Sequence, residues 1–129
     1  MKEAAVASHI RLEAAKRNVL LWRNNSGGFY DQTGRFVRYG LGNFTEKDGV
    51  KSSDFVGPTP VFITPEMVGT VVGVFTAVET KPTDWKFNIN DKDHLAQAKF
   101  IDIVRSVGGY AGFAQSVEDF LRIVKHDNR

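Results

Sequence analysis

Glu79 and Lys81 lie two residues apart at the end of a long apolar run, so their charges are the first candidates for chemistry. The run, residues 71–78, is rich in β-branched side chains, which is typical of a central strand buried on both faces. Side chains two positions apart on a strand share a face, roughly 7 Å from each other. The sequence therefore predicts a carboxylate and an ammonium side by side at an exposed strand end, with the Thr80 carbonyl between them and Pro82 ending the strand.

A second carboxylate belongs to an expected strand earlier in the chain. Asp54 lies within residues 52–57, far enough ahead of Glu79 for a turn and a return strand. If the two strands are neighbours, both carboxylates and the Thr80 carbonyl converge. Such an all-oxygen set suits Mg²⁺ or Mn²⁺ and not Zn²⁺. A metal ion there lowers the pKa of a bound water and polarises a phosphoryl oxygen, and with Lys81 nearby this predicts phosphodiester hydrolysis.

Two expected helices contribute further polar groups. Residues 2–18 have one apolar stripe at helical spacing, and Glu3 falls in the middle of it. Glu3 is therefore either a site residue or a favourable charge on the helix dipole. In the helix expected over residues 94–107, Gln97 shares a face with apolar residues, so its amide is expected at the core. The positions expected to be buried are Val6, Ala7, Ile10 and Ala14 in the first helix, and Ala96, Phe100, Ile103, Val104 and Val107 in the second.

The other segments complete a mixed pattern. The order helix, several strands, helix, strand, helix predicts an α/β (α+β) fold in which a mixed sheet is flanked by helices. Strands are expected over residues 19–23, 36–39 and 110–114, with a turn over residues 24–28 and a helical turn at Pro65. The helix over residues 94–107 is expected to be capped by Gly108-Gly109. A last helix starts at Ser116 with a capping box to Asp119, and it is expected to bury Val117, Phe120, Leu121 and Val124.

Composition limits the class of protein. A chain of 129 residues suits one domain with one core, and 42% hydrophobic with 25% charged residues is ordinary for a soluble globular protein. The net charge of +2 is compatible with a nucleic-acid partner without requiring one. The absence of Cys excludes disulfides and thiolate metal sites. No segment approaches the roughly 20 apolar residues of a transmembrane helix, so we expect a cytoplasmic protein without a membrane partner.

Several loop residues are candidate contacts to nucleic-acid phosphates. Arg23 and Asn25 lie at the end of a short strand and in the turn after it, and the alternative for both is a structured turn. Lys47, Lys51 and Lys86 fall in polar loops that flank the expected site, where they would add positive charge against a polyanion. The alternative for these lysines is a solvated rim.

The segments together resemble a known nuclease pattern. Ser53-Asp54 followed by Val78-Glu79-Thr80-Lys81 resembles the PD-(D/E)XK nuclease signature, although no proline precedes Asp54. Over almost the whole chain, the segments resemble a stand-alone VRR-NUC domain of the type found in phages. The segments that carry this resemblance are the first helix with Glu3, Trp22-Arg23-Asn24-Asn25, Ser52-Ser53-Asp54, Phe75 to Lys81, Gln97-Ala98-Lys99-Phe100, Gly108-Gly109-Tyr110-Ala111 and Ser116-Val117-Glu118-Asp119.

The resemblance implies a single nuclease domain over residues 1–129 with a restriction-endonuclease-like αβββαβ core. It also implies a homodimeric, Mg²⁺- or Mn²⁺-dependent endonuclease that cuts branched DNA such as Holliday junctions. The alternatives are a nucleic-acid-binding module without catalysis and a basic structural protein. The residues that the resemblance assigns to the site are Asp54, Glu79 and the Thr80 carbonyl as metal ligands, Lys81 beside the attacking water, and Glu3 and Gln97 from the two helices.

Overall fold

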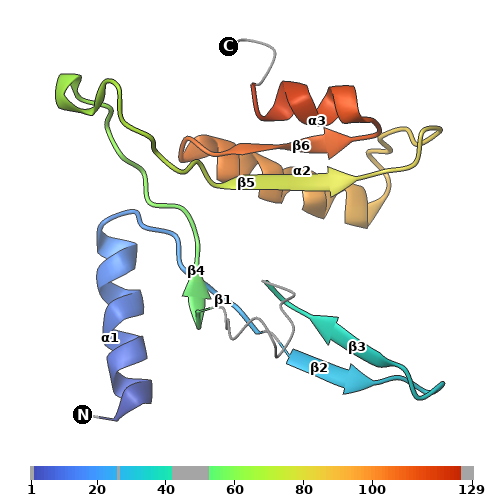
Figure 1. The fold of residues 1–129 in the computed structure, drawn as a ribbon, viewed down its shortest axis with the longest axis horizontal. Coiled ribbons are helices and arrows are strands. Elements are labelled where there is room, and N and C mark those ends of the chain that lie inside the picture. Colours follow the sequence, from blue (N-terminus) through green and yellow to red (C-terminus); the bar gives the residue numbers. More distant parts are fainter. Residues whose placement is uncertain (1, 26, 42–52, 126–129) are drawn as a thin grey trace. The chain divides into compact units, whose positions relative to one another are not determined.

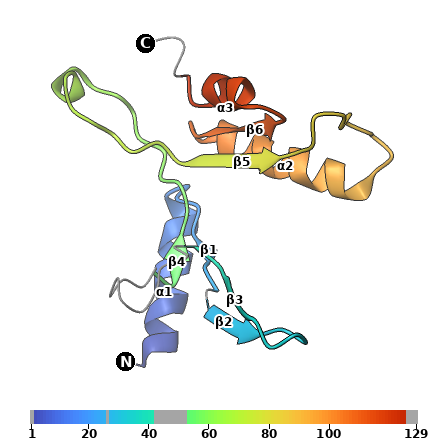
Figure 2. The same cartoon turned by 45° about the vertical axis from the view of Figure 1, so that its right-hand side comes forward.

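The computed structural model describes residues 2–25, 27–41 and 53–125, which belong to two units (Figures 1 and 2). The first unit is Met1–Gly57 and the second is Pro58–Arg129. The placement of one unit relative to the other is not determined, so each unit is described by itself. The expectation of a single domain over residues 1–129 stays a prediction.

Helix α1 (Glu3–Lys16) opens the first unit, and its alanine-rich sequence consists largely of strong helix formers. It ends just before Asn18, which has a left-handed backbone conformation with φ of 59°. Its apolar stripe is covered only in part, because Ala14 is buried while Val6 and Ile10 are 41% and 49% exposed. The helix of 14 residues is about 21 Å long, and the same unit contains two strands of two residues that each span about 7 Å.

The strands of that length are β1 (Trp22–Arg23) and β4 (Phe55–Val56), which pair antiparallel. Both are shorter than the strands that the sequence predicts. Asn24 extends the pairing, since its backbone N–H donates to the Asp54 carbonyl at 2.8 Å and its side-chain amide to the Ser53 carbonyl at 2.9 Å. Ser53, the residue before the candidate metal ligand Asp54, is thus held by an asparagine that the sequence places in a turn.

A β-hairpin occupies residues for which the sequence predicts a turn. Strand β2 (Gly27–Tyr30) pairs antiparallel with β3 (Phe36–Tyr39). Strand β3 confirms the strand predicted over residues 36–39, whereas β2 begins where a turn was predicted. A Cβ on Gly28 would collide with the ring of Phe36, so the glycine leaves room for an aromatic side chain of the partner strand. The expected turn over residues 24–28 is wrong at this point because glycine marks close packing as well as turns.

The second unit is a parallel strand pair joined through a helix (Figure 1). Strand β5 (Thr76–Thr80) pairs with β6 (Tyr110–Ala114), and α2 (Lys92–Ser106) makes the crossover that a parallel pair requires. Helix α3 (Val117–Ile123) follows β6, and a 3₁₀ turn, η2 (Pro65–Met67), precedes β5 as expected. Figures 1 and 2 both show α2 and α3 beside the strand pair.

The two helices cover opposite faces of this strand pair. Side chains alternate along a strand, so Glu79 of β5 faces α2, where Gln97 bonds to it. On the other face, a Cβ on Gly112 of β6 would lie 2.9 Å from the Ile123 side chain of α3. The buried residues of this small core are Ile101, Val104, Ala111 and Ala114.

Strand β5 is shorter and more exposed than its apolar run predicts. Residues 70–75 lie outside any strand, and Val71 is 99% exposed. The register gives the reason: Thr76 pairs with Tyr110, and the chain before Tyr110 turns through Gly108 at φ 87°. The Tyr110 N–H still donates to the Phe75 carbonyl at 2.8 Å, but β6 does not continue beside residues 70–74. The prediction of a strand buried on both faces from Val71 is therefore wrong.

Helix α2 packs against the strand pair through the face that contains Gln97. Ile101 and Val104 are buried there, but Phe100 and Ile103 are 41% and 46% exposed. Val104 is buried as predicted, whereas the predicted burial of Phe100 and Ile103 is wrong. A pair of strands covers a narrower face of a helix than a full sheet does. The predicted core positions that are likewise exposed are Ala96 in α2, and Val117 and Phe120 in α3.

The protein therefore has the predicted mixed α/β class, with three helices and small antiparallel and parallel sheets among the described residues. The described strands pair as three separate two-stranded sheets, so the αβββαβ nuclease core stays a prediction. Within residues 2–25, 27–41 and 53–125, no helix has both the length and the apolar character that crossing a bilayer requires.

Helix α3 begins with the predicted side-chain cap. The Ser116 hydroxyl accepts from the Asp119 backbone N–H at 3.1 Å, and the Asp119 carboxylate accepts from the Gln115 backbone N–H at 2.9 Å. Because this cap satisfies helix N–H groups, we expect Ser116→Ala to lower the free energy of unfolding by about 1 kcal/mol. Urea denaturation measures the change, and Ser8→Ala, at an exposed position inside α1, should change it by less than about 0.5 kcal/mol. Equal stability of the Ser116 variant and wild type would contradict the cap.

Candidate functional site

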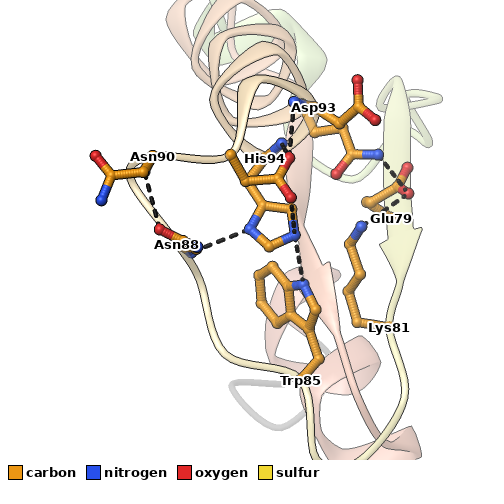
Figure 3. Close-up of polar contacts among 9 residues, drawn as sticks. Glu79, Lys81, Trp85, Asn88, Asn90, Asp93 and His94 are labelled. Carbon is orange, nitrogen blue, oxygen red and sulfur yellow. Dashed lines mark hydrogen bonds and ion pairs between the residues drawn. The ribbon is translucent and has the colours of Figure 1, made fainter.

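The candidate site is the end of β5, where Glu79 and Lys81 lie on one face as the strand period predicts (Figure 3). The Lys81 Nζ lies 3.7 Å from the Glu79 Oε1, and the Gln97 Nε2 donates to the same oxygen at 3.0 Å. The Glu79 side chain is 41% exposed and the Lys81 side chain only 14%. Glu79 and Lys81 thus form an ion pair, and an amide from α2 joins it.

Lys81 is enclosed by aromatic rings. Its Nζ lies 5.3 Å from the ring centroid of Trp85 and 6.0 Å from that of Phe113. The faces of such rings attract a cation, and the aliphatic stem of a lysine packs well against them. The expectation that Lys81 projects freely from a strand end is therefore wrong, because the chain after Pro82 folds back over it.

Gln115 holds that returning segment. Its Nε2 lies 3.0 Å from the Pro82 carbonyl oxygen, 3.2 Å from that of Thr83 and 2.8 Å from that of Trp85. An amide nitrogen has two hydrogens, which these three acceptors share. The Trp85 ring consequently rests against Phe113, with 4.8 Å between the centroids. Sequence reasoning missed Gln115, since nothing in its local pattern signals a contact thirty residues away in the chain.

His94 connects this segment to α2. The Trp85 Nε1 lies 3.0 Å from the His94 Nε2, and the Asn88 backbone nitrogen lies 3.0 Å from the His94 Nδ1 (Figure 3). A neutral imidazole has one acceptor nitrogen, so only one of these N–H groups donates to it at a time. The carboxylate of Asp91 lies 3.6 Å from the His94 Nε2, next to the indole. The histidine was given no role from sequence, although it orients the ring that covers Lys81.

The same Asp91 caps α2, and this affects the pH dependence of stability. The backbone N–H of His94, above all, holds the pKa of the Asp91 carboxyl below its ordinary 3.8, with help from the Asp93 backbone N–H and the charges of His94 and Lys81. A lowered folded-state pKa stabilises the fold above the unfolded-state pKa, and this contribution is lost as pH falls through the folded value. Asp91→Asn should therefore reduce the fall in melting temperature between about pH 5 and about pH 2.5.

Thermal unfolding followed by circular dichroism across this pH range provides the test. Asp93→Asn is the matched control, because it removes an equal charge from the same helical turn without removing the cap. Its melting temperature should follow that of the wild type. If the Asp91 variant loses as much stability on acidification as the wild type, the cap makes no contribution to the pH dependence.

Asp54 and Glu3 belong to the first unit and are both exposed. Asp54 directly precedes β4, which pairs with β1, whereas Glu79 lies in β5, which pairs with β6. The described strands of Asp54 and Glu79 are therefore not paired with each other, and convergence of the two carboxylates stays a prediction.

Glu3 is the first residue of α1, where its charge interacts favourably with the helix dipole. Its expected place on a buried face is wrong because this end of the helix is uncovered.

Two kinds of oxygen meet on the β5 side of α2. The Gln97 Oε1 is buried and accepts no hydrogen bond from the described residues, and it belongs to the amide that binds Glu79. Amide and carboxylate oxygens are ligands that Mg²⁺ and Mn²⁺ prefer. Among the described residues, no group of three or more His, Asp or Glu side chains gathers to hold a metal ion. A complete ligand set therefore needs further oxygens, such as the Thr80 carbonyl and a second carboxylate.

A pocket of about 420 Å³ opens beside these oxygens, between β5 and α2. Glu79 and Gln97 supply its polar groups, and the remaining lining is apolar. The lining residues are Ala77, Val78, Glu79, Ala96, Gln97, Phe100 and Ile101.

Three of the five predicted phosphate contacts lie in the described part of the chain, and all three are exposed. They are Arg23 in β1, Asn25 after it, and Lys86 in the segment that follows β5. The Arg23 guanidinium lies 5.4 Å from the ring centroid of Phe55, so its stem is partly fixed. The roles of these residues stay predictions. Lys47 and Lys51 lie outside the described residues.

Comparison of the chain with protein-family models, with curated proteins and with solved structures gives no match in any of the three. The resemblance to a stand-alone VRR-NUC nuclease therefore rests on the sequence segments quoted above. Of the residues that this resemblance assigns to the site, the structure brings together the side chains of Glu79, Lys81 and Gln97.

Proposed function

We propose that this protein is a metal-dependent endonuclease that hydrolyses phosphodiester bonds in branched DNA such as Holliday junctions. The observation that carries the proposal is the group at the end of β5, in which Gln97 and Lys81 both approach one oxygen of Glu79. Phosphodiester hydrolysis needs an anionic group that binds a cation and a fixed positive charge where negative charge develops. Glu79 and Lys81 match these two requirements.

The contacts of Glu79, Lys81 and Gln97 support the roles proposed for these three residues. Glu79 would hold Mg²⁺ or Mn²⁺ together with the Thr80 carbonyl and Asp54. The bound ion supplies a water of lowered pKa and polarises a phosphoryl oxygen. Lys81 keeps a positive charge beside this position, and the two rings around its stem restrict where the ammonium can lie. Gln97 fixes the orientation of the Glu79 carboxylate.

A nucleic-acid-binding module without catalysis is the second candidate. The observation that favours it is the burial of Lys81, whose ammonium already has a carboxylate and two ring faces as partners. Such an ion pair can serve the fold alone. In that case Arg23, Asn25 and Lys86 would contact phosphates, and Glu79 would bind no metal.

A cleavage assay separates the two candidates. A four-way junction and a linear duplex with the same arms are incubated with the protein in Mg²⁺, in Mn²⁺ and in EDTA. We expect cleavage of the junction in the presence of either metal and none in EDTA. Junction binding without cleavage in all three conditions favours the module, and the absence of both binding and cleavage overturns both candidates.

We further propose that the protein acts as a homodimer in the cytoplasm. A four-way junction has two-fold symmetry, and one small site reaches one strand at a time, so a C₂ dimer matches the substrate. Large exposed apolar side chains support association, among them Phe62 at 93% and Ile63 at 70% exposure. Light scattering at micromolar concentration gives the mass, and a monomeric mass both free and with junction DNA would exclude the dimer.

A further inference from the structure

The β2–β3 hairpin exposes four aromatic side chains. Tyr30 is 73% exposed and Phe36 44%, and the fractions for Phe29 and Tyr39 are 51% and 50%. Residues directly opposite in an antiparallel pair share a face, and so do residues two positions apart. Tyr30 and Phe36 therefore lie on one face of the hairpin, and Phe29 and Tyr39 on the other. So much exposed aromatic surface on so small an element is typical of a binding surface.

Among the residues of β2 and β3, only those on one face include a cation. The Arg38 Cζ lies 4.9 Å from the ring centroid of Phe36, whose ring is in turn 5.1 Å from that of Tyr30. Gly28, opposite Arg38, has no side chain, so the Phe36 ring lies against its backbone. We call Tyr30, Phe36 and Arg38 the stacking face. Phe29 and Tyr39 form an aromatic pair of similar exposure, at 6.1 Å, without an arginine.

The turn that joins the two strands is fixed by its own hydrogen bonds. The Asp31 Oδ1 accepts from the backbone N–H groups of Thr33 and Arg35, both at 2.9 Å, and from the Thr33 hydroxyl at 2.6 Å. This carboxylate is engaged within the turn, and the Arg35 side chain beside it is 82% exposed. The turn, together with the contact of Arg38 with the Phe36 ring, therefore orders the stacking face before any partner binds, which lowers the entropy lost on binding.

We propose that the stacking face binds unpaired nucleobases of single-stranded DNA, with Arg38 facing its phosphates. Every base has a π face that stacks on an aromatic ring, and each such contact changes affinity by roughly 5- to 100-fold. In a duplex these faces are occupied by neighbouring base pairs, so the stacking face distinguishes unpaired from paired bases. The choice of DNA as the nucleic acid rests on the proposed function.

Charge identifies nucleic acid as a better occupant than a second copy of the chain. The protein carries a net charge of +2, so a second copy on this face would bring like charges together near Arg35 and Arg38. An apolar protein partner would have no reason to prefer the stacking face over the face of Phe29 and Tyr39. A polyanion with flat aromatic groups complements both the rings and Arg38.

The experiment compares the same substitution on the two faces of the hairpin. Fluorescence anisotropy measures binding of a labelled thymidine 12-mer and of a labelled duplex, in EDTA so that no cleavage intervenes. Tyr30→Leu keeps an apolar side chain and removes the π face, and it should weaken binding of the single strand about 5-fold or more. Tyr39→Leu is the matched control and should change it less than about 2-fold. Tyr30→Trp should restore binding, and duplex binding should change less than about 2-fold in every variant.

The outcomes separate this proposal from the endonuclease. A wild-type protein that binds the 12-mer through Tyr30 but cleaves no DNA with metal supports the stacking face and overturns the endonuclease. A protein that cleaves junctions, but in which Tyr30→Leu leaves binding of the 12-mer unchanged, overturns the stacking face alone. If Tyr30→Leu and Tyr39→Leu weaken binding of the 12-mer equally, the stacking face is overturned as well. Equal losses would mean that both substitutions act on the folding of the hairpin. A fall in oligomer mass in Tyr30→Leu would assign the face to a second copy.

Discussion

Lys81→Met is expected to fold normally and to lower the rate of junction cleavage by on the order of 10²- to 10³-fold, the usual effect of removing one group that stabilises transition-state charge. The Lys81 side chain is only 14% exposed and its stem lies between Trp85 and Phe113. Methionine keeps the length and the apolar packing of this stem, so the substitution removes the ammonium alone. Alanine would in addition leave a gap between the two rings, and its effects on folding and on catalysis would be mixed.

Single-turnover cleavage, a gel shift with junction DNA and thermal unfolding should be measured on the same preparations. Lys99→Met, at an exposed position of α2, is the control for the loss of one positive charge and should cleave within about threefold of the wild type. Cleavage by Lys81→Met at the wild-type rate would mean that Lys81 serves the fold and not the reaction.

Glu79→Gln and Asp54→Asn are each expected to lower the affinity for Mn²⁺ at least about 10-fold, because each removes one negative ligand from a shared ion. The shared ion also predicts that the double variant loses less than the sum of the two single losses in binding free energy. Titration calorimetry measures these affinities, and Asp84→Asn, an exposed carboxylate outside the site, is the control. If Asp54→Asn leaves the affinity for Mn²⁺ unchanged while Glu79→Gln lowers it, Asp54 and the first unit do not contribute to the metal site.

Without metal, Glu79→Gln is not expected to raise the melting temperature, although neutralising one of several clustered carboxylates often does. The Glu79 carboxylate accepts from Gln97 and lies beside Lys81, so its charge is already balanced within the second unit. Its removal leaves the largely buried Lys81 ammonium without its carboxylate, which is destabilising.

The parts of the fold that could be predicted are those set by neighbours in the chain. Strand period placed Glu79 and Lys81 on one face, the Gly108-Gly109 pair ended α2, and the cap at Ser116 started α3. Each of these depends on a few consecutive residues, whose geometry is the same in most proteins. The αβ class follows from the order of such segments, which is why it was predicted correctly.

The parts that could not be predicted depend on contacts distant in sequence. The exposure of Val71 depends on where β6 begins, and Gly28 belongs to a strand because Phe36 lies against it. The cover over Lys81 depends on Gln115, whose partners precede it by about thirty residues. For the site, sequence spacing gives which side chains share a face, as for Glu79 and Lys81, but not which strands pair, so the pairing of the Asp54 strand β4 with β1 could not be predicted.

Gln115 belongs at once to the start of α3 and to the cover over Lys81. Its backbone N–H donates to the carboxylate of Asp119, and its side-chain amide donates to the carbonyls of the segment 82–85. We therefore expect the helix start and the cover to open together as one unit of local unfolding. Fraying of the first turn of α3 would then release the segment that shields the ammonium of Lys81 from water. On this expectation α3, far from Lys81 in the chain, sets how often that charge becomes accessible to solvent.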